Sequence, residues 1–328
     1  MVAPATRARV VQAITTAALT GLLGHAGTGK SMALRAAHAE HDGPKLHLDA
    51  RIVDASRLRD LSHDFTGSGS SSGGGMLLTI DNVEVATPAL TVAIADLVGT
   101  WSSPSRVAVA GRRLPPPILS AIEDRRGRLV RASELEFTDD ELEEVLGGLV
   151  TARLRAGELH LLAERFARWP VVLDGVAREL RSATITDDDT WNQLVRRYLV
   201  APSAVRSQLE MLVAAAPTRR FQDAVVRLSG LPAFDDALCQ QLGVSDGVDE
   251  LRNLGLPLRE VDHGLIALRI GIRDVLQATS PEPTLARSAA TRYLEVGRPD
   301  AALEVLASPA TATNLAAMLA ELPLGELG

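Results

Sequence analysis

The sequence predicts an α/β domain with a parallel sheet, followed by a region that is almost entirely helical. Short apolar runs alternate with segments of helical spacing from residue 5 to residue 111, which is typical of a parallel sheet covered on both faces. From Thr138 onward the apolar residues follow a helical period, with interruptions at four X-Pro pairs, of which Trp169-Pro170 is the first. We therefore expect the architecture to change close to Thr138.

The α/β part contains four candidate strands, each a short apolar run of the length expected for a buried strand. The strands lie at 18–23, 45–49, 76–80 and 106–110, and helical spacing is found at 5–17, 32–41, 56–63 and 89–98. The glycine- and serine-rich stretch 66–75 cannot order itself by burial, so we expect a flexible loop there. Farther along, residues 283–321 suggest two helices that meet at Gly297-Arg298-Pro299.

Composition limits the classes of protein to which the chain can belong. Its 328 residues suffice for about two domains. The net charge of −7 argues against a broad surface for nucleic acid or an anionic membrane. Cys239 is the only cysteine, which excludes an intramolecular disulfide or a multi-cysteine metal site and fits a reducing compartment. Since no run of 18 apolar residues indicates a transmembrane helix, we expect a cytoplasmic protein.

The strongest motif is GHAGTGKS, from Gly24 to Ser31, which matches every fixed position of a GxxxxGK[ST] phosphate loop between a strand and a helix. Its glycines allow the tight path that points backbone amides at phosphate oxygens, and the following helix adds its positive end. Lys30 would neutralise the β and γ phosphates, and Ser31 would bind Mg²⁺. We therefore expect ATP or ADP with Mg²⁺, bound by Gly24, Gly27, Thr28, Gly29, Lys30, Ser31 and Met32.

A phosphate site of this kind needs an acid on a neighbouring strand to hold the magnesium shell. Asp81 follows the run 76–80 and is our candidate, with an ordinary strand-end turn as the alternative. Asn82 stands where many hydrolytic relatives carry a second acid. Because an amide cannot take a proton from water, we expect slow hydrolysis unless Glu84 substitutes, and we expect Glu84 to be a solvated loop residue. Arg112 ends the next strand and is placed to reach a γ-phosphate, although surface ion pairing explains it equally well.

Together with several later motifs, these residues resemble the STAND class of P-loop NTPases, and within it the MalT-like regulators of the LuxR type. The segment 45–49 resembles the second strand of that family, and 106–117 resembles a strand with its sensor arginine and proline-rich turn. Residues 135–141, LEFTDDE, match the family's LxFTxxE signature. Arg168-Trp169-Pro170 is similar to its GWP motif, with arginine in place of glycine.

The resemblance implies a switch in which ADP keeps the nucleotide and winged-helix domains closed, while ATP and an inducer open them for self-association. It implies that Lys30, Ser31 and Asp81 serve phosphate and Mg²⁺. By position, Arg112 would sense the γ-phosphate and Pro170 would touch the base. The implied domains are a P-loop domain at 1–137, a helical lid at 138–198, a winged-helix-like domain at 199–280 and the start of TPR-like repeats at 281–328.

Three functions remain open from the sequence. The resemblance favours a regulatory module of a transcription regulator that binds ATP or ADP and hydrolyses ATP slowly, if at all. Its partners would be a second copy of the chain, a regulatory protein or a small-molecule inducer. We recognise no DNA-reading element in the sequence, so we do not expect direct binding of DNA by this chain. An AAA-like turnover ATPase acting on DNA is the alternative, and Asn82 counts against its fast hydrolysis. The third is a nucleotide-binding scaffold without hydrolysis.

Overall fold

A computed structural model of the chain describes residues 4–60, 75–101, 104–150, 161, 163–166, 168–182, 193, 203–276 and 281–307. The chain forms two compact units, Met1–Ala163 with Arg168–Arg181 and Glu164–Ala167 with Ser182–Gly328. The loop predicted at 66–75 lies almost wholly outside the described residues. None of the described helices is both long and apolar enough to cross a membrane.

The first unit contains a five-stranded sheet with strand order β2-β3-β4-β1-β5, in which every pairing is parallel. The strands are β1 (Leu19–Leu23), β2 (Lys45–Asp49), β3 (Leu77–Asp81), β4 (Arg106–Gly111) and β5 (Arg128–Val130). The predicted parallel sheet is confirmed, and β1 to β4 lie within one residue of the predicted runs. The sequence did not predict β5, because this strand has only three residues and begins with an arginine.

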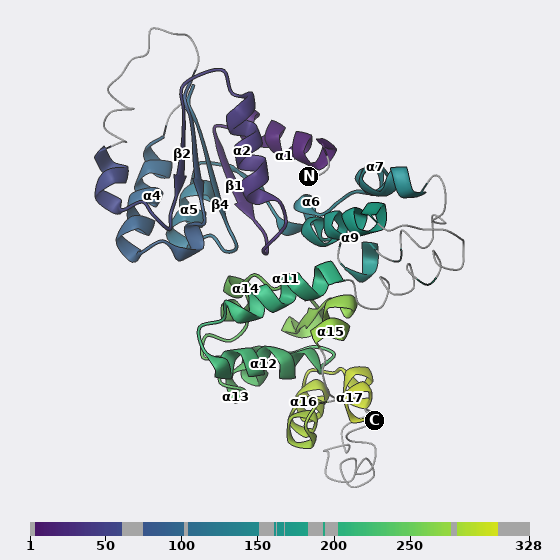
Figure 1. The fold of residues 1–328 in the computed structure, drawn as a ribbon. Coiled ribbons are helices and arrows are strands. Elements are labelled where there is room, and N and C mark those ends of the chain that lie inside the picture. The colour runs from purple at the N-terminus through teal and green to yellow at the C-terminus, as the bar shows by residue number, and fades with distance from the viewer. Residues whose placement is uncertain are drawn as a thin grey trace. The chain divides into compact units, whose positions relative to one another are not determined.

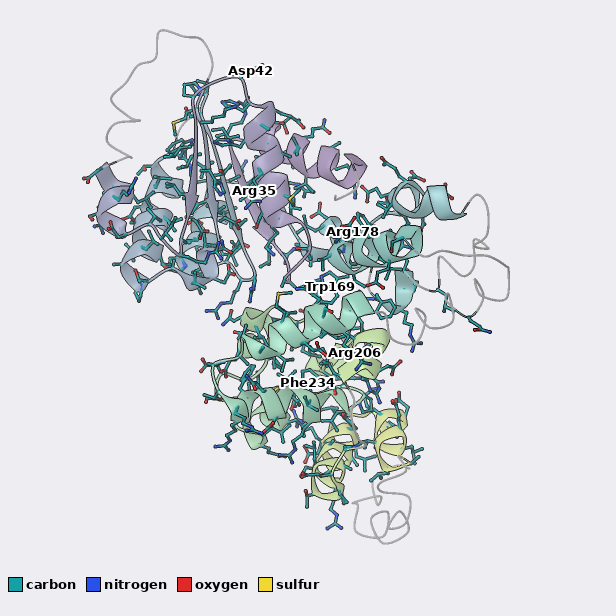
Figure 2. All side chains as sticks on the ribbon, in the orientation of Figure 1. Arg35, Asp42, Trp169, Arg178, Arg206 and Phe234 are labelled. Carbon is teal, nitrogen blue, oxygen red and sulfur yellow. The ribbon has the colours of Figure 1, made fainter. Side chains whose placement is uncertain are left out.

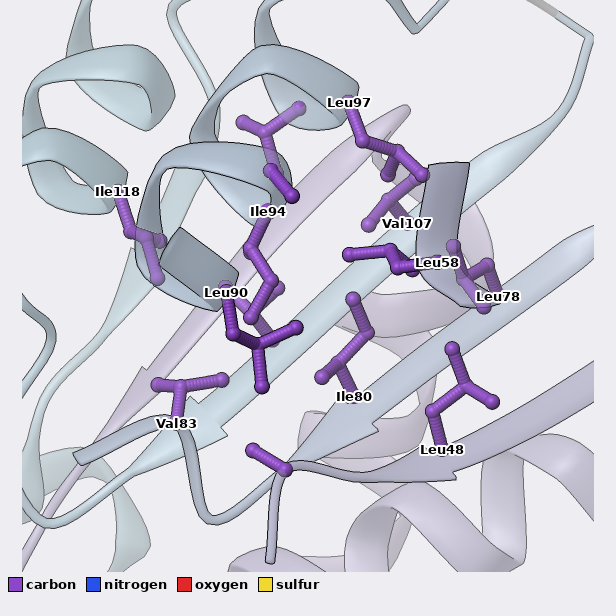
Figure 3. Close-up of a cluster of buried hydrophobic side chains, with 14 of the residues drawn as sticks. Leu48, Leu58, Leu78, Ile80, Val83, Leu90, Ile94, Leu97, Val107 and Ile118 are labelled. Carbon is purple, nitrogen blue, oxygen red and sulfur yellow. The ribbon is translucent and has the colours of Figure 1, made fainter. Parts of the chain in front are cut away.

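Helices cover both faces of this sheet (Figure 1). On one face lie α1 (Pro4–Thr16) and α2 (Lys30–Glu40), and on the other lie α4 (Pro88–Thr100) and α5 (Pro116–Asp124). Side chains alternate along the strands, so that Leu78 and Ile80 join the core under α4 whereas Leu77 joins the core under α2. Figure 3 shows the first of these cores, in which Leu90, Ile94 and Leu97 of α4 pack over the strands. Both faces are therefore apolar, as expected for a buried parallel sheet.

The strand order reverses its direction at the carboxyl ends of β1 and β4. From β1 the chain crosses through α2 to β2 at one edge, whereas from β4 it crosses through α5 to β5 on the far side of β1. Ligands bind to open α/β sheets where the direction of strand order reverses in this way. The Gly24 N–H donates to the carbonyl oxygen of Gly111 at 3.3 Å, which extends the pairing of β1 and β4 to the start of the phosphate loop.

Helices of the first unit that follow the sheet in the sequence include α6 (Ala132–Leu135), α7 (Asp139–Val150) and α9 (Pro170–Ser182). A capping box starts α7, because the Thr138 N–H donates to Glu141 Oε2 at 2.7 Å and the Glu141 N–H donates to Thr138 Oγ1 at 3.4 Å. Glu141 also accepts a hydrogen bond of 3.1 Å from Arg9 Nη2 of α1. The LxFTxxE segment thus joins α7 to α1, and its Leu135 and Phe137 are buried.

The turn before α9 has a backbone conformation that usually favours glycine. Arg168 has a φ of 50°, in the left-handed region. Its carbonyl oxygen accepts from the Phe137 N–H and its Nη1 donates to the Phe137 carbonyl oxygen, both at 3.2 Å, while its Nη2 pairs with Asp139 Oδ1 at 2.8 Å. These contacts offset the backbone cost. They explain how this position carries arginine where the GWP motif has glycine.

In its described residues, the second unit is helical apart from an antiparallel hairpin. Its elements are α11 (Ser203–Ala214), α12 (Arg219–Ser229), α13 (Asp236–Gln241), α14 (Val248–Leu254), β6 (Leu258–Glu260), η2 (Asp262–Gly264), β7 (Ile266–Leu268), α15 (Ile270–Leu276), α16 (Pro283–Glu295) and α17 (Pro299–Leu306). The helical period of the sequence does not indicate the hairpin, whose strands have three residues each. As predicted, α16 and α17 meet at Gly297-Arg298-Pro299, where Gly297 has a φ of 75°.

A buried tyrosine anchors α16 within this unit. The Tyr293 hydroxyl donates to the carbonyl oxygen of Ala233 and accepts from the Ala233 N–H at 3.4 Å. Burial raises the pKa of the Tyr293 phenol, so the side chain remains a neutral donor. Next to it, Arg292 Nε pairs with Asp235 Oδ2 at 2.7 Å.

Tyr293→Phe keeps the ring and removes the hydroxyl from both hydrogen bonds with Ala233. Because the Ala233 amide and carbonyl would lose a buried partner, we expect the free energy of unfolding to fall by about 1–3 kcal/mol, measured by urea denaturation. Leu303→Ala on the exposed side of α17 is the control and should change it by less than about 0.5 kcal/mol. Equal effects of the two substitutions would contradict the anchoring role.

Candidate functional site

The phosphate loop runs from the end of β1 to the start of α2, and its first residue lies beside the end of β4. Gly27 and Gly29 have φ angles of 72° and 91°, in the left-handed region that glycine adopts without strain. Gly29 is the N-cap residue of α2, so the first turn of the helix faces the loop. A helix N-terminus in this position attracts phosphate through its backbone amides and its dipole.

Lys30 is buried although it carries a charge, and only 8% of the residue is exposed. Its Nζ donates to the carbonyl oxygens of Gly24 at 2.6 Å and His25 at 2.9 Å. Burial lowers the pKa of Lys30 to about 8, against the opposing effect of the carboxylates Glu84 and Asp81. Backbone carbonyls therefore hold an ammonium for which an anionic phosphate would be a stronger partner.

A pocket of about 310 Å³ opens beside the loop, and its volume is within the range of small-molecule sites. It is lined by Gly27, Gly29, Lys30, Ser31, Met32, Pro170, Val171 and Asp174. The structure thus brings Met32 and Pro170 to the same pocket as the loop residues. Gly24 and Thr28 do not line it. Gly24 contacts Lys30 and β4, and the buried Thr28 hydroxyl donates to the His25 carbonyl oxygen at 3.0 Å, so both residues support the loop from within.

Pro170 and Val171 line this pocket, and the segment Trp169-Pro170-Val171 is hydrogen-bonded directly to the loop. Trp169 Nε1 donates to the carbonyl oxygen of Ala26 at 2.7 Å, and the Val171 N–H donates to that of Gly27 at 3.1 Å. The Trp169 ring is fully buried and meets the His25 ring edge-on, with 5.4 Å between ring centroids. Figure 2 labels Trp169 and Arg178, which mark this segment and the α9 helix that continues from it. Below, we call these contacts between 169–171 and 25–27 the loop clamp.

Asp81 ends β3 at the same edge of the sheet, and only 5% of the residue is exposed. Its Oδ1 accepts the Asn82 N–H at 2.9 Å. The described residues contain no cluster of three or more His, Cys, Asp or Glu that could hold a metal by itself. The Asp81 carboxylate and the Ser31 hydroxyl are nonetheless suitable ligands for Mg²⁺. This ion is usually held by one or two protein oxygens together with substrate phosphates and water.

Arg112 and Glu84 lie together at the carboxyl end of β4. Arg112 Nε pairs with Glu84 Oε1 at 3.5 Å, and the Arg112 backbone N–H donates to Glu84 Oε2 at 3.1 Å. The Glu84 side chain is only 6% exposed. The expectation that Glu84 is a solvated loop residue is therefore wrong. A left-handed backbone at Asn82, with a φ of 59°, and the short helix η1 (Val83–Val85) turn this carboxylate back toward β4.

Asn82 itself faces a different neighbour. Its Nδ2 donates to Asp49 Oδ1 at 3.1 Å, at the end of β2. Hydrogen bonds from the Arg51 guanidinium are the main cause that lowers the pKa of Asp49 to about 2, and the bond from Asn82 adds to them. The amide of Asn82 thus closes a polar network along the strand ends.

Sequence reasoning missed the contributions of Val171, Asp174 and the buried Glu84. The first two could have been found, because a helix that begins at Pro170 places residue 174 on the same face. Asp174 also pairs with Arg178 one turn later, at 3.1 Å. Asn82 could have indicated the position of Glu84. Asparagine tolerates the left-handed conformation that starts a turn, and a turn at residue 82 brings residue 84 back toward the sheet.

Comparison of the sequence with protein-family models and with curated proteins found no match. Solved structures do match. The Walker-type ATPase of Pyrococcus abyssi is 17% identical over 83% of this chain and 95% of that one, with a TM-score of 0.51. Thermotoga maritima RuvB, a Holliday junction branch migration motor, is 14% identical over 84% and 95%, with a TM-score of 0.45. A katanin structure is 14% identical over 62% and 83%, with a TM-score of 0.40.

The chain has the fold of a P-loop NTPase. The parallel sheet, the phosphate loop between β1 and α2, and the likeness to the Walker-type ATPase agree on this class. At this level of identity the likeness concerns the fold.

The pKa of Lys30 predicts proton uptake when a phosphate binds. At pH 8 about half of the Lys30 side chains are neutral without ligand, and a bound phosphate restores the charge. We expect ADP binding in EDTA to take up about half a proton at pH 8 and about one at pH 9.5, so that affinity falls as the pH rises through this range. Calorimetry in buffers of different ionisation enthalpy measures this uptake. Adenosine, which has no phosphate, is the control, and ADP binding without uptake at pH 9.5 would refute the prediction.

Proposed function

We propose that the protein is a conformational switch operated by ATP and ADP, in which the phosphate loop sets the position of α9. The loop clamp is the observation that carries this proposal. Two hydrogen bonds, of 2.7 and 3.1 Å, join the loop carbonyls to Trp169 and Val171 at the start of α9. The candidate nucleotide pocket is lined by Gly27 of the loop and by Pro170 and Val171 of the other segment, so a ligand that fills it touches both segments.

A chain of contacts links Lys30 to the loop clamp. The Lys30 ammonium donates to the carbonyl oxygen of His25, and the His25 ring packs against Trp169. A phosphate that draws Lys30 away would release that carbonyl, one residue before the carbonyl of Ala26 that Trp169 binds. ATP and ADP differ by one phosphate, and such a difference in contacts is what allows a ligand to shift a conformational equilibrium. The second unit includes the segment Glu164–Ala167 just before α9 and the chain from Ser182 onward.

The finer proposal is a regulatory module of a STAND-type transcription regulator with MalT-like organisation. It keeps the division into a P-loop domain at 1–137, a lid at 138–198, a winged-helix-like domain at 199–280 and repeats from 281. The LxFTxxE segment that caps α7 and the Arg168-Trp169-Pro170 segment at the loop support this proposal. In such a cytoplasmic regulator, ATP together with an inducer would open the domains, and the open form would self-associate.

The roles of the site residues are part of this proposal. Lys30 binds the β and γ phosphates, Arg112 senses the γ-phosphate, and Pro170 lies against the base. Ser31 and Asp81 hold Mg²⁺, which supplies neutralisation of phosphate charge when it is bound. Asn82 cannot serve as a base, because it is an amide and is engaged with Asp49, so the slow hydrolysis that we propose depends on another group.

An AAA-like turnover ATPase is the second candidate, and one observation favours it. The buried Glu84 provides a carboxylate beside the site that could replace the acid missing at Asn82. Turnover rate separates the two candidates. Protein purified without added nucleotide is analysed for bound nucleotide and then for single-turnover ATP hydrolysis. Retained ADP and a turnover below about one per minute support the switch, whereas several turnovers per second would refute it. Lys30→Ala should abolish binding of both nucleotides. A protein that is purified empty and responds neither to ATP and Mg²⁺ nor to this substitution would favour the scaffold.

Trp169→Phe tests the loop clamp, because it keeps an aromatic ring and removes the N–H that binds Ala26. In the wild type, we expect hydrogen exchange of the α9 amides to differ between ADP and a non-hydrolysable ATP analogue. Loss of one hydrogen bond of about 1 kcal/mol should accelerate exchange in α9 about fivefold and shrink the difference between nucleotides.

Trp101→Phe is the matched control for this test. The Trp101 N–H has no hydrogen-bond partner in the described part of the chain, so the same substitution should leave α9 unaffected. Identical α9 exchange with both nucleotides in the wild type would refute coupling between the loop and α9.

A further inference from the structure

The carboxylate of Glu84 is buried beside the phosphate loop, and burial of a charged side chain requires an explanation. Only 6% of its side chain is exposed, and both of its oxygens face Arg112: Oε1 the guanidinium at 3.5 Å and Oε2 the backbone N–H at 3.1 Å. A surface ion pair would need neither the burial nor the second contact, and such pairs contribute little stability. The position of this carboxylate therefore indicates a role at the site.

Two backbone features bring the carboxylate to this position. The left-handed turn at Asn82, with a φ of 59°, and η1 reverse the chain directly after Asp81. Gly111 provides the space on β4, because a Cβ there would lie 2.9 Å from Glu84 Oε2 and 2.7 Å from the Arg113 carbonyl oxygen. Glu84 thus occupies a place that a side chain at 111 would close.

Backbone contacts place Glu84 next to the start of the phosphate loop. The Gly24 N–H donates to the Gly111 carbonyl oxygen at 3.3 Å, and Glu84 Oε2 lies against this same Gly111. Glu84 also acts electrostatically on Lys30, as does Asp81. Asn82 has turned away from this group toward Asp49, at 3.1 Å. Among the described residues, Glu84 is therefore a buried carboxylate beside the phosphate loop that is not already assigned to Mg²⁺.

Resting on the proposed ATP-dependent function of this site, we propose that Glu84 accepts the proton of the attacking water, and that its ion pair with Arg112 restrains it until a terminal phosphate draws Arg112 away. The attacking water forms the new bond to the γ-phosphorus, and the bond from that phosphorus to the bridging oxygen breaks. ADP leaves with the bridging electron pair, one water proton passes to the Glu84 carboxylate, and that proton then returns to solvent or phosphate. The products are ADP and inorganic phosphate.

The pairing gives Arg112 two alternative partners. With Glu84, the guanidinium faces one carboxylate at 3.5 Å. A terminal phosphate offers more oxygen atoms and a greater negative charge, and arginine binds such groups strongly through paired N–H donors. Release of the base and recognition of ATP would then be one event, so ADP leaves the carboxylate paired.

Glu84→Gln tests both parts, because the amide keeps the size and an oxygen acceptor for the Arg112 N–H but cannot take a proton. We expect single-turnover ATP hydrolysis to fall by about 10²–10⁴-fold, while ADP affinity stays within about threefold of the wild type. Since the neutral amide holds the Arg112 guanidinium less strongly, the preference for a non-hydrolysable ATP analogue over ADP should rise by about fivefold. A purely structural role of Glu84 would not increase that preference.

Glu123→Gln, on the exposed side of α5, is the matched control and should leave all three measurements unchanged.

If Glu84→Gln does not fold, Glu84→Asp withdraws the carboxylate by one methylene and should slow hydrolysis by about 10²-fold. Hydrolysis within about threefold of the wild type in a folded Glu84 variant would overturn the assignment of the base, as would a wild type that binds ATP and hydrolyses none. An unchanged nucleotide preference would overturn the restraint by Arg112. Each of these results leaves the switch intact, whereas a wild type that binds no nucleotide would refute the proposed function itself.

Discussion

A charge buried at the edge of the sheet governs the arrangement of the groups around it. Removing the Lys30 ammonium from water is costly unless oxygen atoms surround it. The carbonyl oxygens of Gly24 and His25 provide direct partners, and the carboxylates of Glu84 and Asp81 provide opposite charge. Burial still has the largest effect and lowers the pKa to about 8. The loop thus contains a cation whose desolvation the surrounding oxygen atoms offset only in part. Binding of an anionic ligand beside Lys30 is therefore energetically favourable.

Contacts extend from this charge in two directions. Through His25 they reach Trp169 and the start of α9, and the electrostatic effect of Glu84 on Lys30 links the charge to Arg112, the partner of Glu84 at the end of β4. The strand order makes both directions possible, because β4 lies directly beside β1 and the phosphate loop leaves the sheet between them. One ligand position can therefore influence both the helical segment and the group that faces the terminal phosphate.

Local sequence predicted the parts of the fold that local sequence determines. The strands β1 to β4 are apolar runs and were placed within one residue, and the glycines at 27 and 29 predicted the path of the phosphate loop. The short β5 and the hairpin β6–β7 were not predicted, because three-residue strands depend on pairing with distant segments rather than on a pattern of their own. Pro170 was placed near the nucleotide only through the resemblance, and its position in the pocket is consistent with that role. Glu84 was misjudged because its burial requires both the turn at Asn82 and the approach of Arg112, which are far apart in the sequence.

The environment of Trp169 also makes its intrinsic fluorescence a probe of the contact between the phosphate loop and α9. The indole is fully buried, donates its N–H to the phosphate loop and lies edge-on to an imidazole. Indole emission depends on polarity and hydrogen bonding at the N–H, so separation of the loop from α9 changes the light that this side chain emits. The sequence contains only three tryptophans, which keeps the background small. Movement at this place can therefore be followed in real time in the unlabelled protein.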